Sequence, residues 1–413
     1  MLDRLLRSLP FARIDDAARA RLYKLTGGLP LAVQLVVRQL GRDADSTVSK
    51  VLDTLEGSGD LGKEIYAGCI ARLAPRAQRV LRCLAHFEAD DLPEGLLKSV
   101  VTEVLGETHA DAAGEFRKIR MRLLNSGLLQ PQGHTAYRMH RLVQGSALGG
   151  RDGGREATDA ENMQHAARAI CSTWNAKYDK YQISTWAYAD QLIPHVQCFA
   201  RRCLARAGAL SLDVVRAMVG GSVEGLLFQG GFHLSEHRHS LNAAEAMMRN
   251  CQRIVEGAVG LSARDKSLGL AVVEHGLGMV QVYLCHNDNA ALYFAKALEK
   301  RRSILGENHR VLADTYNHMG NVFYNKGDYD AALEHYKKAL DIELPVLGEK
   351  HPSVATTYSN MGNVFYNKGD YDAALDHYKK ALDIQLAVLG EKHPSVATTY
   401  GCCLLYTSPS PRD

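Results

Sequence analysis

The chain has 413 residues, of which 46% are hydrophobic and 23% are charged, as is ordinary for a globular protein. Its formal net charge of +3 gives no general reason to expect nucleic acid or an anionic membrane as a partner. The longest apolar run, residues 28–37, is too short to span a bilayer, and the charged N-terminus is no signal peptide. The nine cysteines lack paired spacings, so we expect reduced thiols and a cytoplasmic protein.

The first predicted elements are helices. Residues 22–40, LYKLTGGLPLAVQLVVRQL, begin on helical spacing, turn at two glycines and resume as a helix after Pro30. Further on, residues 73–87, 91–101 and 116–144 follow a helix–helix–helix–hairpin order, in which PQGHTAY separates GLLQ from YRMH as a wing would. We therefore predict a helical subdomain over residues 1–60 and a winged-helix domain over residues 61–148.

Two motifs in this half suggest a family. GGLPLAV and YRMHRLVQ together resemble the Gly-Leu-Pro-Leu and Met-His-Asp motifs of NB-ARC proteins, which are nucleotide-switched regulators of the STAND type. The resemblance implies that Pro30 packs against adenine and that His140 reaches a phosphate of bound ADP. Arg141 stands where the family has aspartate, which departs from the family's pattern.

The phosphate-binding part of such a switch is missing from the sequence. No GxxxxGK[ST] loop occurs in it, so no backbone amides, lysine and hydroxyl are provided to hold phosphates and magnesium. We expect no catalytic residues and no required cofactor, with ADP or ATP bound only in the presence of an upstream domain. On this interpretation the chain is a fragment that is truncated at both ends.

Residues 145–154 read as a flexible glycine-rich joint. We interpret residues 149–260 as a linker followed by irregular bridging helices. Within it, HLSEH places His233, Glu236 and His237 in the H-x-x-E-H pattern of zinc peptidases. The sequence supplies no clear third ligand, and the segment also fits an ordinary helix pair. We therefore expect no metal site, although His239 adds a third imidazole.

Upstream of this region, the helix at residues 115–124 carries four basic residues that could face DNA phosphates. They are Arg117, Lys118, Arg120 and Arg122. Because they spread around the helix, a solvated surface or a contact with an upstream domain explains them better than DNA binding. We expect no nucleic acid and no membrane as partners.

The C-terminal third is a repeat. Residues 316–347 match residues 358–389 at 27 of 32 positions, at a shift of 42 residues. A degenerate copy lies upstream, because four residues precede their counterparts in the next copy by the same 42 residues. They are Gly278, Ala290, Phe294 and Ala297.

Each copy reads as two helices. Pro352 suits a first helical turn, Gly369 suits a left-handed turn, and Asp370 can cap the second helix. Tyr358, Met361, Gly362 and Phe365 share one face of the first helix, and Ala374, Tyr378 and Ala381 form the inner face of the second.

This pattern resembles tetratricopeptide repeats of the kinesin light chain and nephrocystin type. We assign residues 261–400 to such repeats, with two clear copies, one degenerate copy and one cut short. The second HPSVATTY leads into GCCLLYTSPSPRD and not into another copy. Residues 403–413 resemble a translated sequencing adapter, so we predict that they are disordered.

Polar residues recur at helical spacing along the first helices of the repeats. Such residues should line the inner surface of the superhelix. Asparagine is a poor helix former, and its amide can both donate to and accept from a peptide backbone. We therefore predict that an extended peptide binds along this asparagine stripe. Its members are Asn317, Asn321, Tyr324, Asn360, Asn363 and Tyr366.

These observations predict a mainly α protein in which a winged-helix domain precedes an α-solenoid of tetratricopeptide repeats. The expected function is that of a protein-interaction scaffold, the repeat-bearing part of an NB-ARC-type regulator, whose ligand is a protein or an extended peptide. Two alternatives stay open. One is a kinesin-light-chain-like cargo adaptor without nucleotide control, and the other is a winged-helix DNA-binding regulator.

Overall fold

The computed structural model describes residues 20–21, 61–106, 111–133, 135–148, 155–178, 183–206, 210–219, 225–237, 240–391 and 394–407. The chain divides into two compact units, residues 1–218 and residues 219–413. The division falls inside the region that the sequence assigns to the bridge. Pro30 and nearly all of the helical subdomain predicted at residues 1–60 lie outside the described residues.

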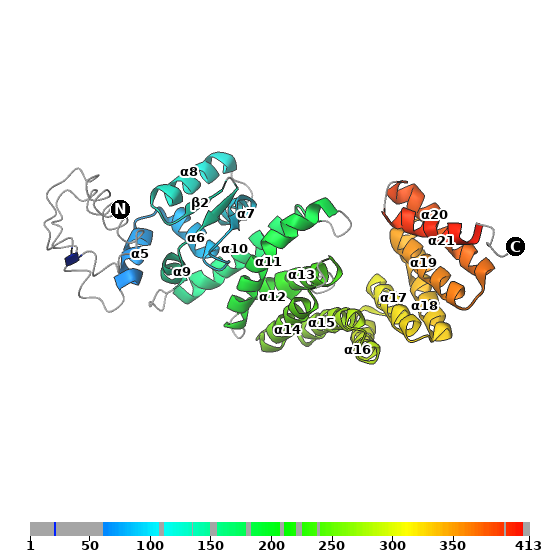
Figure 1. Cartoon of the computed structure of the whole chain (residues 1–413). Coiled ribbons are helices and arrows are strands. Elements are labelled where there is room, and N and C mark those ends of the chain that lie inside the picture. The colour runs from blue at the N-terminus through cyan, green and yellow to red at the C-terminus, as the bar shows by residue number, and fades with distance from the viewer. Residues whose placement is uncertain are drawn as a thin grey trace. The chain divides into compact units, whose positions relative to one another are not determined.

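The first unit contains a small sheet among helices (Figure 1). Its helices are α5 (Leu61–Ala71), α6 (Pro75–Leu84), α7 (Glu94–Leu105), α8 (Ala112–Asn125), α9 (Arg141–Leu148), α10 (Arg155–Asn175), α11 (Ile183–Leu204) and α12 (Leu212–Val219). The strands β1 (Leu92–Pro93), β2 (Gln130–Gln132) and β3 (Ala136–Arg138) form an antiparallel sheet in the order β1-β3-β2. Helices and hairpin lie where the sequence predicts them. Their assignment to the winged-helix class stays a prediction.

Local sequence explains where these helices begin. Pro75 occupies the first turn of α6, where its missing N–H costs nothing. The Asp111 carboxylate accepts a 2.9 Å hydrogen bond from the Gly114 amide and so caps α8. Apolar residues from α6, α7 and α8, among them Val80 and Leu97, are fully or almost fully buried and form the core. The β2–β3 hairpin lies on this core, and His140 of the YRMHRLVQ motif follows the hairpin.

The second unit is a helical solenoid. It comprises α13 (Leu226–Phe232), a π-helical turn at His233–His237, α14 (Leu241–Gly257), α15 (Ala263–Tyr283), α16 (Asn287–Leu305), α17 (Arg310–Asn325), α18 (Tyr329–Leu347), α19 (Pro352–Asn367), α20 (Tyr371–Leu389) and α21 (Pro394–Thr407). The pairs α15–α16, α17–α18 and α19–α20 are hairpins of two packed helices, and each hairpin packs on the next (Figure 1).

The predicted turn chemistry of the repeats is confirmed. Pro352 lies in the first turn of α19, and Gly369 has a φ of +80°. The Asp370 side chain accepts from the Ala373 amide at 3.2 Å and caps α20, as Asp328 caps α18. The predicted inner face of α20 is buried, with Ala374, Tyr378 and Ala381 at most 3% exposed. Repeat boundaries therefore follow from local sequence alone.

Close helix approach within each repeat depends on a glycine that faces an aromatic ring. A Cβ atom on Gly362 would lie 2.8 Å from two atoms of the Tyr378 ring. Gly320 faces Tyr336 in the preceding repeat, and Gly278 faces Phe294 in the degenerate one. The predicted 42-residue correspondence of the degenerate copy thus extends to its packing.

The C-terminal tail differs from the prediction. We expected disorder from Cys403 onward, but α21 continues to Thr407. The residues 403–407, CLLYT, contain neither glycine nor proline, so nothing in them interrupts a helix that has already begun. The first helix breaker is Pro409, and residues 408–413 lie outside the described residues.

Candidate functional site

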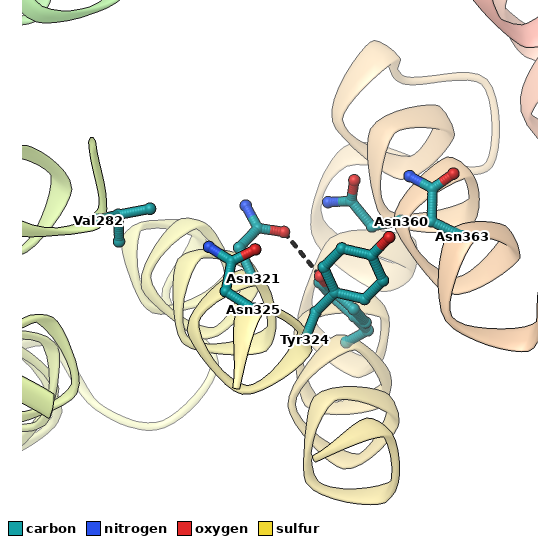
Figure 2. A pocket seen from close by; sticks show the side chains of 7 residues that line it. Val282, Asn321, Tyr324, Asn325, Asn360 and Asn363 are labelled. Atoms are coloured by element: carbon teal, nitrogen blue, oxygen red, sulfur yellow. Dashed lines mark hydrogen bonds between the residues drawn. The ribbon is translucent and has the colours of Figure 1, made fainter. Parts of the chain in front are cut away.

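A pocket of about 220 Å³ opens on the repeats, and four of the six residues of the predicted asparagine stripe line it. We call it the amide pocket. Figure 2 shows Asn321, Tyr324 and Asn325 of α17 across from Asn360 and Asn363 of α19. Its lining is Val282, Asn321, Tyr324, Asn325, Tyr336, Asn360 and Asn363. None of these side chains carries a charge, so the pocket suits a neutral polar group.

The asparagine oxygens are occupied inside the protein. The Tyr336 hydroxyl donates to Asn321 Oδ1 at 2.6 Å, and the Tyr378 hydroxyl donates to Asn363 Oδ1 at 2.6 Å. Burial, followed by the effect of the nearby Tyr324, raises the pKa of Tyr336, so its phenol stays protonated and remains the donor. Because the Asn321 and Asn363 oxygens each accept from a tyrosine, the Nδ2 group of each amide is left to donate to a ligand. Figure 2 shows this arrangement for Asn321, whose oxygen is joined by the dashed line.

The side chains of Tyr324 and Asn360 complete the surface of the pocket. Asn367 Nδ2 donates to the Tyr324 hydroxyl at 2.7 Å across the two repeats, which holds the Tyr324 ring at the pocket. The side chain of Asn360 has no hydrogen-bond partner within the described part of the chain. Asn360 can therefore both donate and accept, whereas Asn321 and Asn363 offer donors.

Two residues of the predicted stripe lie elsewhere. Asn317 Nδ2 donates to Glu343 Oε1 at 3.0 Å and to Thr357 Oγ1 at 2.8 Å, so it belongs to a polar contact between repeats. Tyr366 is 41% exposed, and its ring lies beside that of Tyr371, with 5.8 Å between the centroids. Packing of α18 and α19 thus encloses the position one turn before Asn321, and peptide binding along the stripe stays a prediction.

Sequence reasoning missed three residues of the pocket. Asn325 lies one turn beyond Asn321 on the same face of α17, a spacing that could have revealed it. Val282 precedes Tyr324 by the 42-residue period, so the alignment of the repeats also contained that signal. The sequence did not distinguish Tyr336 from an ordinary core ring, because Tyr336 is a buried aromatic residue of α18, 1% exposed.

In the first unit, His140 directly precedes α9, and its carbonyl accepts from the Gln144 amide at 3.1 Å. Its ring stacks on that of Tyr66, with 6.0 Å between the centroids. Burial, followed by the charge of Arg138, lowers the pKa of His140, which favours the neutral imidazole. The counterpart predicted at Pro30 lies outside the described residues, so its place beside His140 stays a prediction.

The basic helix α8 is only partly free to face a ligand. Arg120 Nε donates to the Tyr137 hydroxyl at 2.5 Å, and its guanidinium also lies over the Tyr137 ring. Lys118 forms an ion pair with Glu115 at 3.0 Å. Arg117 and Arg122 are exposed. Two of the four basic side chains are therefore engaged with the protein's own surface.

No group of three or more metal-binding side chains is found among the described residues. His233 is buried at the start of the π-helical turn, while the side chains of Glu236 and His237 lie outside the described part. Within that same part, no helix combines the length and the apolar character needed to cross a membrane.

Comparison with known families identifies the repeats. The tetratricopeptide repeat family matches residues 269–343, 311–387 and 353–401. Residues 269–401 are therefore tetratricopeptide repeats, a class of protein-interaction scaffold. A domain of unknown function (DUF7779) matches residues 69–150, over the predicted winged-helix region. No curated protein matches the sequence.

Three solved structures illustrate the similarity. BtubC (BKLC) from P. vanneervenii is 19% identical, with 55% of this chain and 82% of that chain covered and a TM-score of 0.39. A P. anserina protein described as a kinesin light chain with nearly identical TPR-like repeats is 14% identical, with coverages of 44% and 86% and a TM-score of 0.35. A STAND protein with a tetratricopeptide repeat sensor from Pyrococcus horikoshii is 15% identical, with coverages of 98% and 62% and a TM-score of 0.35.

Proposed function

We propose that this chain is a scaffold that binds an extended segment of a partner protein in the amide pocket. The observation that carries the proposal is the orientation of the two amides whose oxygens accept from buried tyrosines. Peptide carbonyl oxygens are acceptors that recur along any extended chain, so the Nδ2 groups of Asn321 and Asn363 can pair with them irrespective of the ligand's side chains. Asn360 adds a group that can also accept a peptide N–H.

The ring of Tyr324 supplies the apolar part of the site. Its hydroxyl is tied to Asn367, so the ring loses little freedom when a ligand side chain packs against it. A few amide hydrogen bonds, each contributing about 1 kcal/mol net, support a Kd on the order of micromolar or weaker. The ligand is therefore an extended peptide with an apolar side chain near the pocket.

The test is a peptide-library screen against the full chain, followed by calorimetric titration of the best ligand. The variant Asn321→Ala/Asn363→Ala is expected to bind that ligand about 30-fold more weakly, because two hydrogen bonds are lost. Tyr336→Phe keeps the ring but releases the Asn321 oxygen, so we expect a smaller loss. Tyr366→Ala is the matched control, since this side chain lies outside the pocket and should leave the affinity unchanged. Undiminished affinity of a normally folded double variant would refute the proposal.

We further propose that residues 22–144 belong to a nucleotide-switched regulator of the NB-ARC type. The support is the pair of motifs and the position of His140, which follows the β2–β3 hairpin and is held on Tyr66. ADP or ATP would then need an upstream phosphate-binding domain. A cargo adaptor without nucleotide control, in contrast, would bind its peptide equally with and without that domain and ADP.

For the chain as it stands we expect no ATP turnover above a buffer blank, because its sequence contains no phosphate-binding loop. Phosphate release during incubation with ATP and magnesium is the measurement. Turnover that disappears in His140→Ala would contradict the expectation.

Salt-dependent binding of duplex DNA would instead favour the winged-helix regulator. The pairing of Arg120 with Tyr137 and of Lys118 with Glu115 argues against this alternative.

A further inference from the structure

A largely buried polar triad recurs at three successive interfaces of the solenoid, at the 42-residue period. Each triad takes one residue from the first helix of a repeat, one from its second helix, and a threonine from the first helix of the next repeat. The three triads are His275, Arg301 and Thr315; Asn317, Glu343 and Thr357; and Ser359, Gln385 and Thr399. The residue from the second helix is at most 7% exposed in all three.

The first triad contains a cation. Arg301 Nη1 donates to Thr315 Oγ1 at 2.5 Å and lies 3.2 Å from His275 Nδ1. Burial, followed by the charge of Arg301, lowers the pKa of His275, so its imidazole is neutral and can accept from the guanidinium. The histidine and the arginine thus match each other as acceptor and donor.

The second triad contains a carboxyl group in place of the guanidinium. Asn317 Nδ2 donates to Glu343 Oε1 at 3.0 Å, and the Thr357 hydroxyl lies 2.7 Å from Glu343 Oε2. Here the first helix provides an amide donor that suits an acceptor from the second helix.

The third triad contains neither charge nor an interlocking hydrogen bond. Gln385 Oε1 and Ser359 Oγ are buried and have no hydrogen-bond partner among the described residues. The Thr399 hydroxyl donates to the Ser395 carbonyl of its own helix at 3.1 Å. The last interface is therefore chemically different from the other two.

Apolar packing hardly distinguishes the two clear repeats from one another. Of 32 aligned positions in the two clear copies, 27 are identical, which leaves five differences. Two of these five, Asn317/Ser359 and Glu343/Gln385, belong to the triads. All three triads contain a threonine. The triads therefore differ only in the residues that the first and second helices of each repeat provide.

We propose that the triads determine which first helix pairs with which second helix, and so prevent exchange of helices between near-identical repeats. A mispaired α18 would bring the Glu343 carboxyl against Ser359, which has no amide donor to offer. A mispaired Arg301 would meet the Asn317 or Ser359 side chain in place of its histidine. The first error leaves the buried Glu343 carboxyl without its amide donor, and losing the partner of a buried group costs more than a matched pair gains.

The test transplants the second triad onto the third interface of the full chain. The variants are Ser359→Asn, Gln385→Glu and the two together, since Thr399 is already present. Native-state hydrogen exchange of α20 and α21 measures how often this end opens. Gln385→Glu alone should speed exchange, because it buries a carboxyl group beside a serine, whereas the double variant should exchange about tenfold more slowly than the unmodified chain.

Val388→Glu is the matched control, because it adds the same charge to α20 at a side chain that is 48% exposed. The proposal is overturned if the change in the double variant equals the product of the two single changes. If Gln385→Glu does not fold, the reverse cycle of Asn317→Ser, Glu343→Gln and the pair decides in the same way. In that cycle the pair should open less often than Asn317→Ser alone, and simple multiplication of the single effects again overturns the proposal.

Discussion

Replacing Gly362 by alanine is expected to destabilise the repeats by about 2–3 kcal/mol. The added Cβ atom would lie 2.8 Å from Cδ1 and Cε1 of Tyr378, well inside van der Waals contact. The ring has little room to retreat, because it is 3% exposed and its hydroxyl donates to Asn363. Relief therefore requires α19 and α20 to move apart, which loosens the buried packing that both helices share.

Denaturant unfolding of the full chain measures this loss. Gly401→Ala is the matched control, since Gly401 is also helical but a Cβ atom there would meet nothing within 4 Å. That change should stabilise by up to about 1 kcal/mol, through helix propensity alone. Equal effects of the two substitutions would show that close packing of glycine on tyrosine does not hold the helices together.

Raising the pH is expected to weaken the solenoid through Glu343. The residue is fully buried, and burial is the largest cause that raises the pKa of its carboxyl above the usual 4.5. The negative charge of Asp314 on α17 acts in the same direction, whereas hydrogen bonds from Thr357 and Asn317 oppose it. Between the unfolded and folded pKa values, the folded chain still holds the proton that the unfolded chain has released. The stabilisation that comes from this proton is therefore present below the unfolded pKa and is lost as pH rises through the folded pKa.

The measurement is the free energy of unfolding as a function of pH for the unmodified chain and for Glu343→Gln. A glutamine cannot titrate. The free energy of unfolding of the unmodified chain, relative to that of Glu343→Gln, should therefore fall by up to about 1.4 kcal/mol per pH unit inside this window. Glu349→Gln, at an exposed position, should show no such dependence. A difference that is constant with pH, or that favours the unmodified chain as pH rises, would contradict the assignment.

The architecture of the repeats was predictable because its causes are local. A proline in the first turn, an aspartate cap and a glycine at positive φ act over a few residues, and a 42-residue period then reproduces them. The faces that pack are also set by spacing along a helix, so the buried positions of α20 followed directly from the sequence. In the first unit, the same kind of signal located the helices and the hairpin.

The chemistry of the amide pocket, in contrast, was decided by tertiary packing. Helical spacing put Asn317 and Asn321 on one face, yet one reaches Glu343 and Thr357 while the other accepts from Tyr336. A side-chain amide can donate or accept in several directions, and which partner it meets depends on how the neighbouring helix crosses it. Sequence therefore located four of the seven residues that line this pocket. Only the packing of α17, α18 and α19 determined that Asn321 and Asn363 offer donors and that Asn317 lies outside the pocket.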